Sequence, residues 1–253
     1  PAVARFPRWG WIGVALCAGG WIVSWLHVPA VRAYQQLAFT PLWVGYIVIV
    51  NALLHRRTGE SLLTRRPLAL LVSAVLSAVF WWYFEFLNRF VRNWHYIHLG
   101  DLSTLQYTLR ATFPFMTVLP AIWSTRELLA SYRRFWADTG AGPALHLPCP
   151  RLSAAALLAA SVLSLALIPR FPDLLFPLVW VSPLLIVTGL GGLVGNAPLV
   201  EDLRRGRWTR IATYAVAALV CGFFWEFWND WSVVKWVYQV PYVSVLHVFE
   251  MPL

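Results

Sequence analysis

Long apolar segments alternate with short polar ones along the chain of 253 residues. Seven such segments cover residues 9–26, 41–54, 67–87, 108–124, 152–168, 174–195 and 209–228. Several approach the roughly 20 residues that an α-helix needs to cross a hydrocarbon core of about 30 Å. Because helices satisfy their own backbone hydrogen bonds inside a bilayer, the pattern predicts an all-α, polytopic membrane bundle with seven spanning helices.

The first, second and fourth segments allow other interpretations. Arg5 and Arg8 precede the first apolar run and Pro29 follows it, so a cleaved signal peptide is an alternative to a spanning helix. The second segment is short unless residues 38–41 join it, and the fourth contains Pro114, Pro120 and, near its start, Arg110.

Four landmarks recur at a nearly fixed offset of 141 to 143 residues. They are Pro7-Arg8 with Pro150-Arg151, Pro41-Leu42 with Pro183-Leu184, Phe84 to Asn88 with Trp225 to Asn229, and Trp94 to Tyr96 with Trp236 to Tyr238. The agreement of the offsets predicts a tandem duplication of a four-helix unit. We expect a first repeat over 1–136, a cytoplasmic linker over 137–150, and a second repeat over 151–253. The second repeat ends before its fourth helix, so we expect the chain to be a fragment.

The basic residues indicate the orientation. With the N-terminus inside, 14 of the 20 Lys and Arg residues fall in the inner segments and 6 in the outer ones. This bias predicts a cytoplasmic N-terminus, and we expect a bacterial inner membrane. Because each repeat has an even number of helices, the two repeats have parallel topology, with a pseudo-twofold axis along the membrane normal.

Composition supports a membrane protein and excludes several other classes. Hydrophobic residues make up 59% of the chain and charged residues 12%, which leaves too few polar side chains for a soluble surface. The net charge of +9 is spread over short segments between apolar runs, so we expect no nucleic-acid binding. Cys17, Cys149 and Cys221 form no disulfide framework and no Cys/His cluster, so no metal site is predicted.

Two pairs of a carboxylate and an amide are the candidates for chemistry. Glu85 with Asn88, and Glu226 with Asn229, lie near the outer ends of the third and seventh segments. A spacing of three residues places each pair on one helical face. Ionisable groups at membrane depth usually face a bundle interior or a wet cavity, so we expect one shared site around the axis. Helix capping or hydrogen bonding between helices is the alternative interpretation.

The two copies differ in charge. Arg89 follows Glu85 at a spacing that allows an ion pair, whereas Asp230 takes that place beside Glu226. Neighbouring carboxylates in a poorly solvated site share a proton or hold a cation, so Glu226 and Asp230 are the favoured catalytic groups, with Glu85 as the third. The candidate binding residues are Asn88, Asn229, Arg89, His247, Glu250, Trp82 and Trp225.

An aromatic stretch follows each motif. Phe90, Trp94 and Ile97 follow helical spacing, so we expect a short helix that lies in the outer interface. A hydrophobic gate for a lipid-like substrate is the alternative. We expect the polar site itself to be lined by Trp81, Trp82, Phe223 and Trp225.

The sequence contains no P-loop, GxSxG, HExxH or dinucleotide fingerprint, and no motif in it indicates a particular cofactor. A membrane-embedded enzyme acting on a lipophilic substrate, lipid or isoprenoid-like, explains the aromatic surroundings and the unequal acidic groups. A transporter or channel with a polar site at the axis explains the duplication equally well, and a non-catalytic membrane subunit is a third hypothesis. The expected partners are membrane lipids and a lipophilic small molecule.

Overall fold

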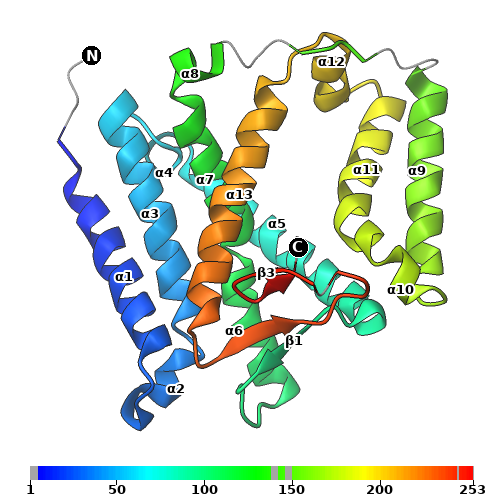
Figure 1. The fold of residues 1–253 in the computed structure, drawn as a ribbon. Coiled ribbons are helices and arrows are strands. Elements are labelled where there is room, and N and C mark those ends of the chain that lie inside the picture. Colours follow the sequence, from blue (N-terminus) through cyan, green and yellow to red (C-terminus); the bar gives the residue numbers. More distant parts are fainter. Residues whose placement is uncertain (1–4, 138–141, 146–149, 244, 253) are drawn as a thin grey trace. The chain divides into compact units, whose positions relative to one another are not determined.

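The computed structural model of the protein describes residues 5–137, 142–145, 150–243 and 245–252 (Figure 1). It is mostly helical, and the chain forms two compact units. The first unit comprises Pro1–Tyr83, Trp94–Tyr132 and Tyr214–Leu253, and the second comprises Phe84–Asn93 and Arg133–Thr213. The predicted linker over 137–150 lies partly outside the described residues. The division into two sequence repeats stays a prediction.

Long helices make up most of the first unit. They are α1 (Arg8–Trp25), α3 (Phe39–Thr58), most of α5 (Pro67–Val91), α6 (Thr104–Phe115), α7 (Val118–Ala130) and most of α13 (Thr209–Asp230). Short elements connect them, namely η1 (Pro29–Val31), α2 (Arg32–Gln35) and α4 (Leu62–Arg65). The helices α1 and α3 pack closely because Gly45 has no side chain. A Cβ atom there would lie 2.4 Å from the backbone nitrogen of Cys17.

The core of the first unit forms where α3 meets α7 and α13. The rings of Trp43 and Trp228 lie 5.1 Å apart at 86°, and Ala121 of α7 joins the same cluster. Hydrogen bonds also cross this core, since Tyr46 Oη lies 2.8 Å from Thr125 Oγ1. Such bonds between helices contribute about 0.6 to 2 kcal/mol each in lipid, so they help to fix α7 beside α3.

The fourth predicted span is two helices rather than one, because the chain breaks between α6 and α7. Pro114 lacks a backbone N–H, and the backbone around Met116 leaves the α-helical ladder. The buried hydroxyl of Ser77, on α5, repairs the break. It donates to the Phe115 carbonyl at 2.5 Å and accepts from the Leu119 N–H at 3.0 Å.

Two short antiparallel sheets correct the all-α prediction. In the first, β1 (Trp94–Ile97) pairs with β2 (Lys235–Tyr238), and in the second, β3 (His247–Val248) pairs with β4 (Met251–Pro252). The expected interfacial helix through Phe90, Trp94 and Ile97 is therefore wrong. Helix α5 ends at Val91, Arg92 has a φ of 53°, and the following residues are aromatic or β-branched strand formers.

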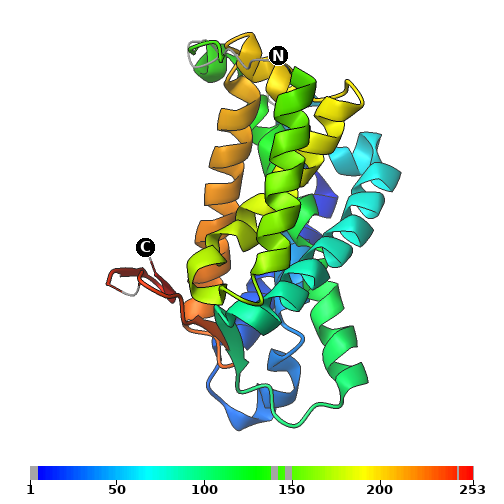
Figure 2. The same cartoon turned by 90° about the vertical axis from the view of Figure 1, so that its right-hand side faces the viewer.

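The second unit contains a helical hairpin. Its elements are α8 (Arg133–Ala137), α9 (Pro150–Leu167), α10 (Pro172–Leu175), α11 (Pro177–Leu193) and α12 (Pro198–Arg204). Helices α9 and α11 lie side by side (Figure 2). Gly189 allows this approach, since a Cβ atom there would lie 3.0 Å from the Ala154 carbonyl oxygen.

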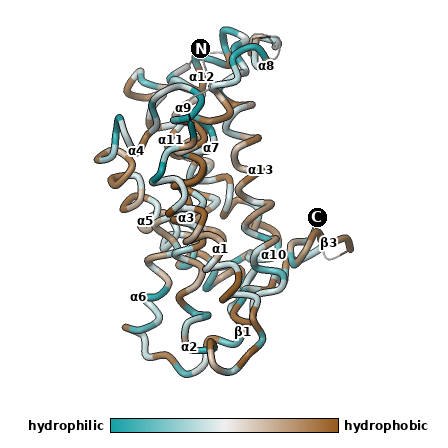
Figure 3. Tube along the Cα trace, turned by 90° about the vertical axis from the view of Figure 1, so that its left-hand side faces the viewer, coloured by the Kyte–Doolittle hydropathy of each residue, from teal (hydrophilic) through white to brown (hydrophobic). Residues whose placement is uncertain are grey.

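Two described helices are long and apolar enough to cross a membrane, namely α5 and α13. Two bent pairs qualify if each is counted as one span, which gives up to four. These pairs are Pro29–Gln35 with Phe39–Thr58, bent by 66°, and Pro177–Leu193 with Pro198–Arg204, bent by 84°. Hydrophobic residues run along α13, while hydrophilic ones gather at the turn from α3 to α4 (Figure 3). The full set of seven spans and their parallel topology stay predictions.

Candidate functional site

Glu226 is a buried carboxyl group in the last two turns of α13, with 4% of its surface exposed. Its Oε1 atom accepts a hydrogen bond of 2.5 Å from the hydroxyl of Tyr238. That hydroxyl in turn accepts a bond of 2.9 Å from the indole Nε1 of Trp236. The other oxygen, Oε2, is buried and has no hydrogen-bond partner among the described residues. The site therefore has one carboxyl oxygen held by Tyr238 and one without a hydrogen bond among the described residues.

Asn229 sets the geometry of this hydrogen-bonded chain. It lies one turn after Glu226 and is completely buried. Its side-chain amide donates to the Trp236 carbonyl at 2.8 Å and accepts from the Trp236 N–H at 3.0 Å. The amide thus fixes the start of β2 against the end of α13. Because residues two apart share one face of a strand, Trp236 and Tyr238 are placed together.

Tyr238 is suited to act as a hydrogen-bond donor to this carboxyl group. Burial raises the pKa of the Tyr238 phenol above its ordinary value, and the neighbouring Glu226 carboxyl adds to the effect. The phenol therefore keeps its proton over the physiological pH range. With Trp236 Nε1 donating to its oxygen, the phenol directs its own proton to the carboxyl group.

A cavity of about 90 Å³ lies in the first unit, beside the hydrogen-bonded chain that links Trp236, Tyr238 and Glu226. Trp236 lines it together with Phe39 and Trp225, and the three rings touch each other with centroids 5.0 to 5.2 Å apart. The remaining lining residues are Gln35, Gln36, Tyr96, Leu99, Leu102, Tyr107, Arg110, Ala111, Pro114, Phe115, Val234 and Lys235. Trp236 therefore contacts the cavity with its ring and reaches Glu226 through Tyr238.

The other predicted residues near Glu226 lie in different surroundings. Asp230 is half-buried, and its carboxylate has no hydrogen bond or ion pair among the described residues. Glu250 forms an ion pair with Lys235, whose Nζ also donates to the Asp230 backbone carbonyl at 3.0 Å. His247 is exposed on β3. The structure thus places Glu250 against a cation rather than against Glu226.

The aromatic residues predicted to line the site are also dispersed. Trp225 lines the cavity. Trp82 instead donates its indole N–H to Thr112 Oγ1 at 3.0 Å, and Phe223 is 53% exposed. The cavity wall is completed by residues that the sequence did not assign to the site, above all Trp236 and Arg110.

The first copy of the motif belongs to the second unit. There the Asn88 side chain accepts a hydrogen bond of 2.8 Å from the Asn93 N–H, so it also holds the turn after its helix. Arg89 is exposed on the same turn. The convergence of Glu85 and Glu226 on one site stays a prediction, because the two carboxyl groups lie in separate units.

Within the described ranges, no group of three or more His, Cys, Asp and Glu side chains could hold a metal ion. The described polar residues form a site suited to proton chemistry, in which hydrogen bonds link an indole to a phenol and the phenol to a carboxyl group. Comparison with protein-family models, curated proteins and solved structures found no match for this chain.

Proposed function

We propose that this protein is a membrane-embedded enzyme that acts on a lipophilic substrate and uses Glu226 as a proton donor. The observation that carries the proposal is the state of the two carboxyl oxygens. Oε1 accepts from Tyr238, and the buried Oε2 has no partner among the described residues. A protonated Oε2 is the arrangement that uses both oxygens, since Oε1 accepts a hydrogen bond and Oε2 would supply a donor for a substrate atom.

Burial favours this protonation state. A charged carboxylate that is removed from water is strongly destabilised unless a cation or several donors surround it. The described residues bring neutral donors rather than a cation to Glu226, namely Tyr238 and the indole of Trp236 behind it, and the nearby cation Lys235 is engaged by Glu250. A neutral carboxyl group that accepts through Oε1 and donates through Oε2 fits these surroundings.

The chemistry that follows is general acid catalysis on an alkene or a carbonyl. With an alkene, the O–H bond at Oε2 breaks and a C–H bond forms, which leaves a carbocation and a Glu226 carboxylate. The hydrogen bond from Tyr238 strengthens as that charge develops. Loss of a proton from a neighbouring carbon restores the neutral carboxyl group. The net reaction is an isomerisation or a cyclisation.

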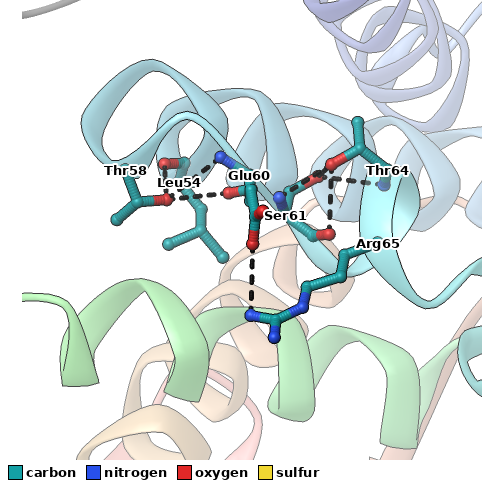
Figure 4. Close-up of polar contacts among 6 residues, drawn as sticks. All are labelled: Leu54, Thr58, Glu60, Ser61, Thr64 and Arg65. Atoms are coloured by element: carbon teal, nitrogen blue, oxygen red, sulfur yellow. Dashed lines mark hydrogen bonds and ion pairs between the residues drawn. The ribbon is translucent and has the colours of Figure 1, made fainter.

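The tandem duplication, which the proposal includes, is supported by one matching ion pair in each copy. Glu60 pairs with Arg65 at 3.1 Å in the turn after α3 (Figure 4). Asp202 pairs with Arg207 at 2.8 Å in the turn before α13. Both members of the second pair lie 142 positions after those of the first, which is the offset of the sequence landmarks.

The register of β1 and β2 supports the duplication independently. Trp94 lies opposite Tyr238, and Tyr96 lies opposite Trp236. Trp94 corresponds to Trp236 and Tyr96 to Tyr238 in the sequence alignment of the copies. The pairing is therefore unchanged when the copies are exchanged, which is the property of a local twofold axis.

A transporter is the second candidate, and the break between α6 and α7 favours it. Broken helices at membrane depth often line transport sites, where their free backbone groups meet a substrate or an ion. Here Ser77 already satisfies two of those groups, at Phe115 and Leu119. This occupation weakens the case for transport and leaves the enzyme as the favoured proposal.

Deuterium labelling tests the enzyme. Membranes from cells that make the whole protein are incubated in D₂O with a lipophilic extract, and the products are examined by mass spectrometry. A proton donor leaves deuterium on carbon in one class of lipophilic compound, and Glu226→Gln should abolish that label. Glu60→Gln is the control, since it removes an exposed carboxylate on another turn. Equal labelling in the Glu226→Gln membranes would exclude Glu226 as the donor.

A further inference from the structure

Arg110 is a cation on the cavity wall that forms no ion pair among the described residues. Its guanidinium donates to the side-chain oxygen of Gln36, and it is only half-buried. The other cation of the wall, Lys235, is neutralised by Glu250. Arg110 is thus the one described charge that faces the cavity and lacks a counter-ion.

Gln36 holds the guanidinium in position. Its amide nitrogen donates to the Leu99 carbonyl at 2.6 Å, so its amide oxygen has to face Arg110. A guanidinium carries five N–H donors in a planar fork, and this contact occupies one nitrogen. The remaining donors match the spacing of two oxygen atoms on a carboxylate or phosphate.

The rest of the cavity suits an apolar group. Phe39, Trp225 and Trp236 form a continuous aromatic wall, and Ala111 and Phe115 add further apolar surface from α6. A volume of about 90 Å³ holds several water molecules, since a cavity needs about 10 to 15 Å³ for one, so it admits a head group and the first carbons of a chain. A longer chain has to continue outside the cavity.

From this pairing of a single unneutralised cation with aromatic walls, we infer that the cavity binds the anionic head of an amphiphile, a carboxylate or phosphate on an apolar chain, with Arg110 as its counter-ion. The inference deepens the proposed function, because it names the class of substrate. Trp236 connects the cavity with Glu226, since its ring lines the cavity and its indole N–H donates to Tyr238, which donates to Glu226.

Calorimetric titration of the whole protein in an uncharged detergent tests this inference. The probes are octyl phosphate, octanoate, octanol and inorganic phosphate. We expect octyl phosphate and octanoate to bind at least about tenfold more tightly than octanol or inorganic phosphate, because they alone offer both the charge and the chain. Octanol binding as tightly as octyl phosphate would reduce the site to an apolar cavity, and equally tight inorganic phosphate would reduce it to a site for small anions. Either result overturns the inference.

Three variants locate the site. Arg110→Gln should weaken octyl phosphate binding at least about tenfold, and Arg110→Lys should have a smaller effect because it keeps the charge without the fork. Arg32→Gln removes an exposed cation of α2 outside the cavity wall and serves as the matched control. Thermal unfolding and gel filtration check that each variant is folded. Equal losses in the Arg110→Gln and Arg32→Gln proteins would mean unspecific attraction, and would contradict the assignment.

Glu226→Gln separates this inference from the proposed reaction. The variant should bind octyl phosphate like the wild type, since Glu226 does not line the cavity. Retained binding with unchanged deuterium labelling would refute the proposed function and leave the ligand site standing. Absent binding in the wild type, with a label that depends on Glu226, would refute the ligand site alone.

Discussion

Tyr238 donates a hydrogen bond to the buried Glu226 carboxyl at 2.5 Å, across the turn that leads from α13 into β2. The contact joins a polar group on an apolar helix to a strand outside that helix. It occupies Oε1 and leaves Oε2 without a hydrogen bond among the described residues. Together with the bond from Trp236, it gives the phenol two hydrogen-bond partners.

Tyr238→Phe should destabilise the protein by about 1 to 3 kcal/mol, because Glu226 Oε1 and Trp236 Nε1 both lose their partner. The free energy of unfolding is measured by denaturant titration in detergent. Tyr242→Phe is the matched control, since Tyr242 belongs to the same segment and is 82% exposed. A Tyr238→Phe protein as stable as the Tyr242→Phe protein would show that the contact contributes nothing.

The stability of the protein should depend on pH through Tyr238. Its pKa is raised in the folded state, so its contribution is complete below the pKa of an unfolded tyrosine, about 10. As the pH rises above that value, the unfolded chain loses the phenolic proton first and the contribution disappears. Unfolding midpoints between pH 8 and about 11 should therefore fall more steeply for the wild type than for Tyr238→Phe. Parallel curves would contradict this expectation.

Ser77→Ala should cost about 1 to 3 kcal/mol, because it leaves the Phe115 carbonyl and the Leu119 N–H without their hydroxyl partner at the break between α6 and α7. Ser73→Ala is the control on the same helix, where the hydroxyl bonds the Leu70 carbonyl one turn back. The free energies of unfolding of the two variants are measured and compared. Similar small losses in both would mean that water or relaxation repairs the break.

The topology is tested by labelling from outside the cell. In a chain without its native cysteines, Asp101→Cys should react with a membrane-impermeant maleimide, while Glu60→Cys and Glu201→Cys should not. Asp101 and Glu60 are exposed, so access within the fold does not limit the reaction. Permeabilised cells provide the control for reactivity. The reverse pattern would place the N-terminus outside and refute the predicted orientation.

The sequence led to Glu226 and Asn229 because polar side chains inside an apolar run are costly and need a reason. Both residues are buried, and Asn229 has a positioning role that a spacing of three residues could not reveal. Tyr238 belongs to one of the repeated sequence landmarks and had no predicted role in the site. Its partner lies 12 positions earlier, across a turn whose course depends on the amide of Asn229.

The sequence did not predict the cavity, for a similar reason. Arg110 was visible as a charge near the start of an apolar segment, but its partner Gln36 lies 74 positions away. No local pattern signals such a contact. The strand β1 was predicted as helix because Phe90, Trp94 and Ile97 repeat at helical spacing, while the backbone reversal at Arg92 leaves no mark in that spacing. Periodicity therefore located the helices better than the connections between them.

The pairing of β1 with β2 also bears on how the protein is made. The two strands are far apart in the sequence, and β2 supplies Trp236 to the cavity and Tyr238 to Glu226. A ribosome has to pass Tyr238 before either feature exists. The helices that precede β2 are therefore made before the site is, and β2 completes it. A product that stops before Lys235 keeps these helices and lacks both Trp236 and Tyr238.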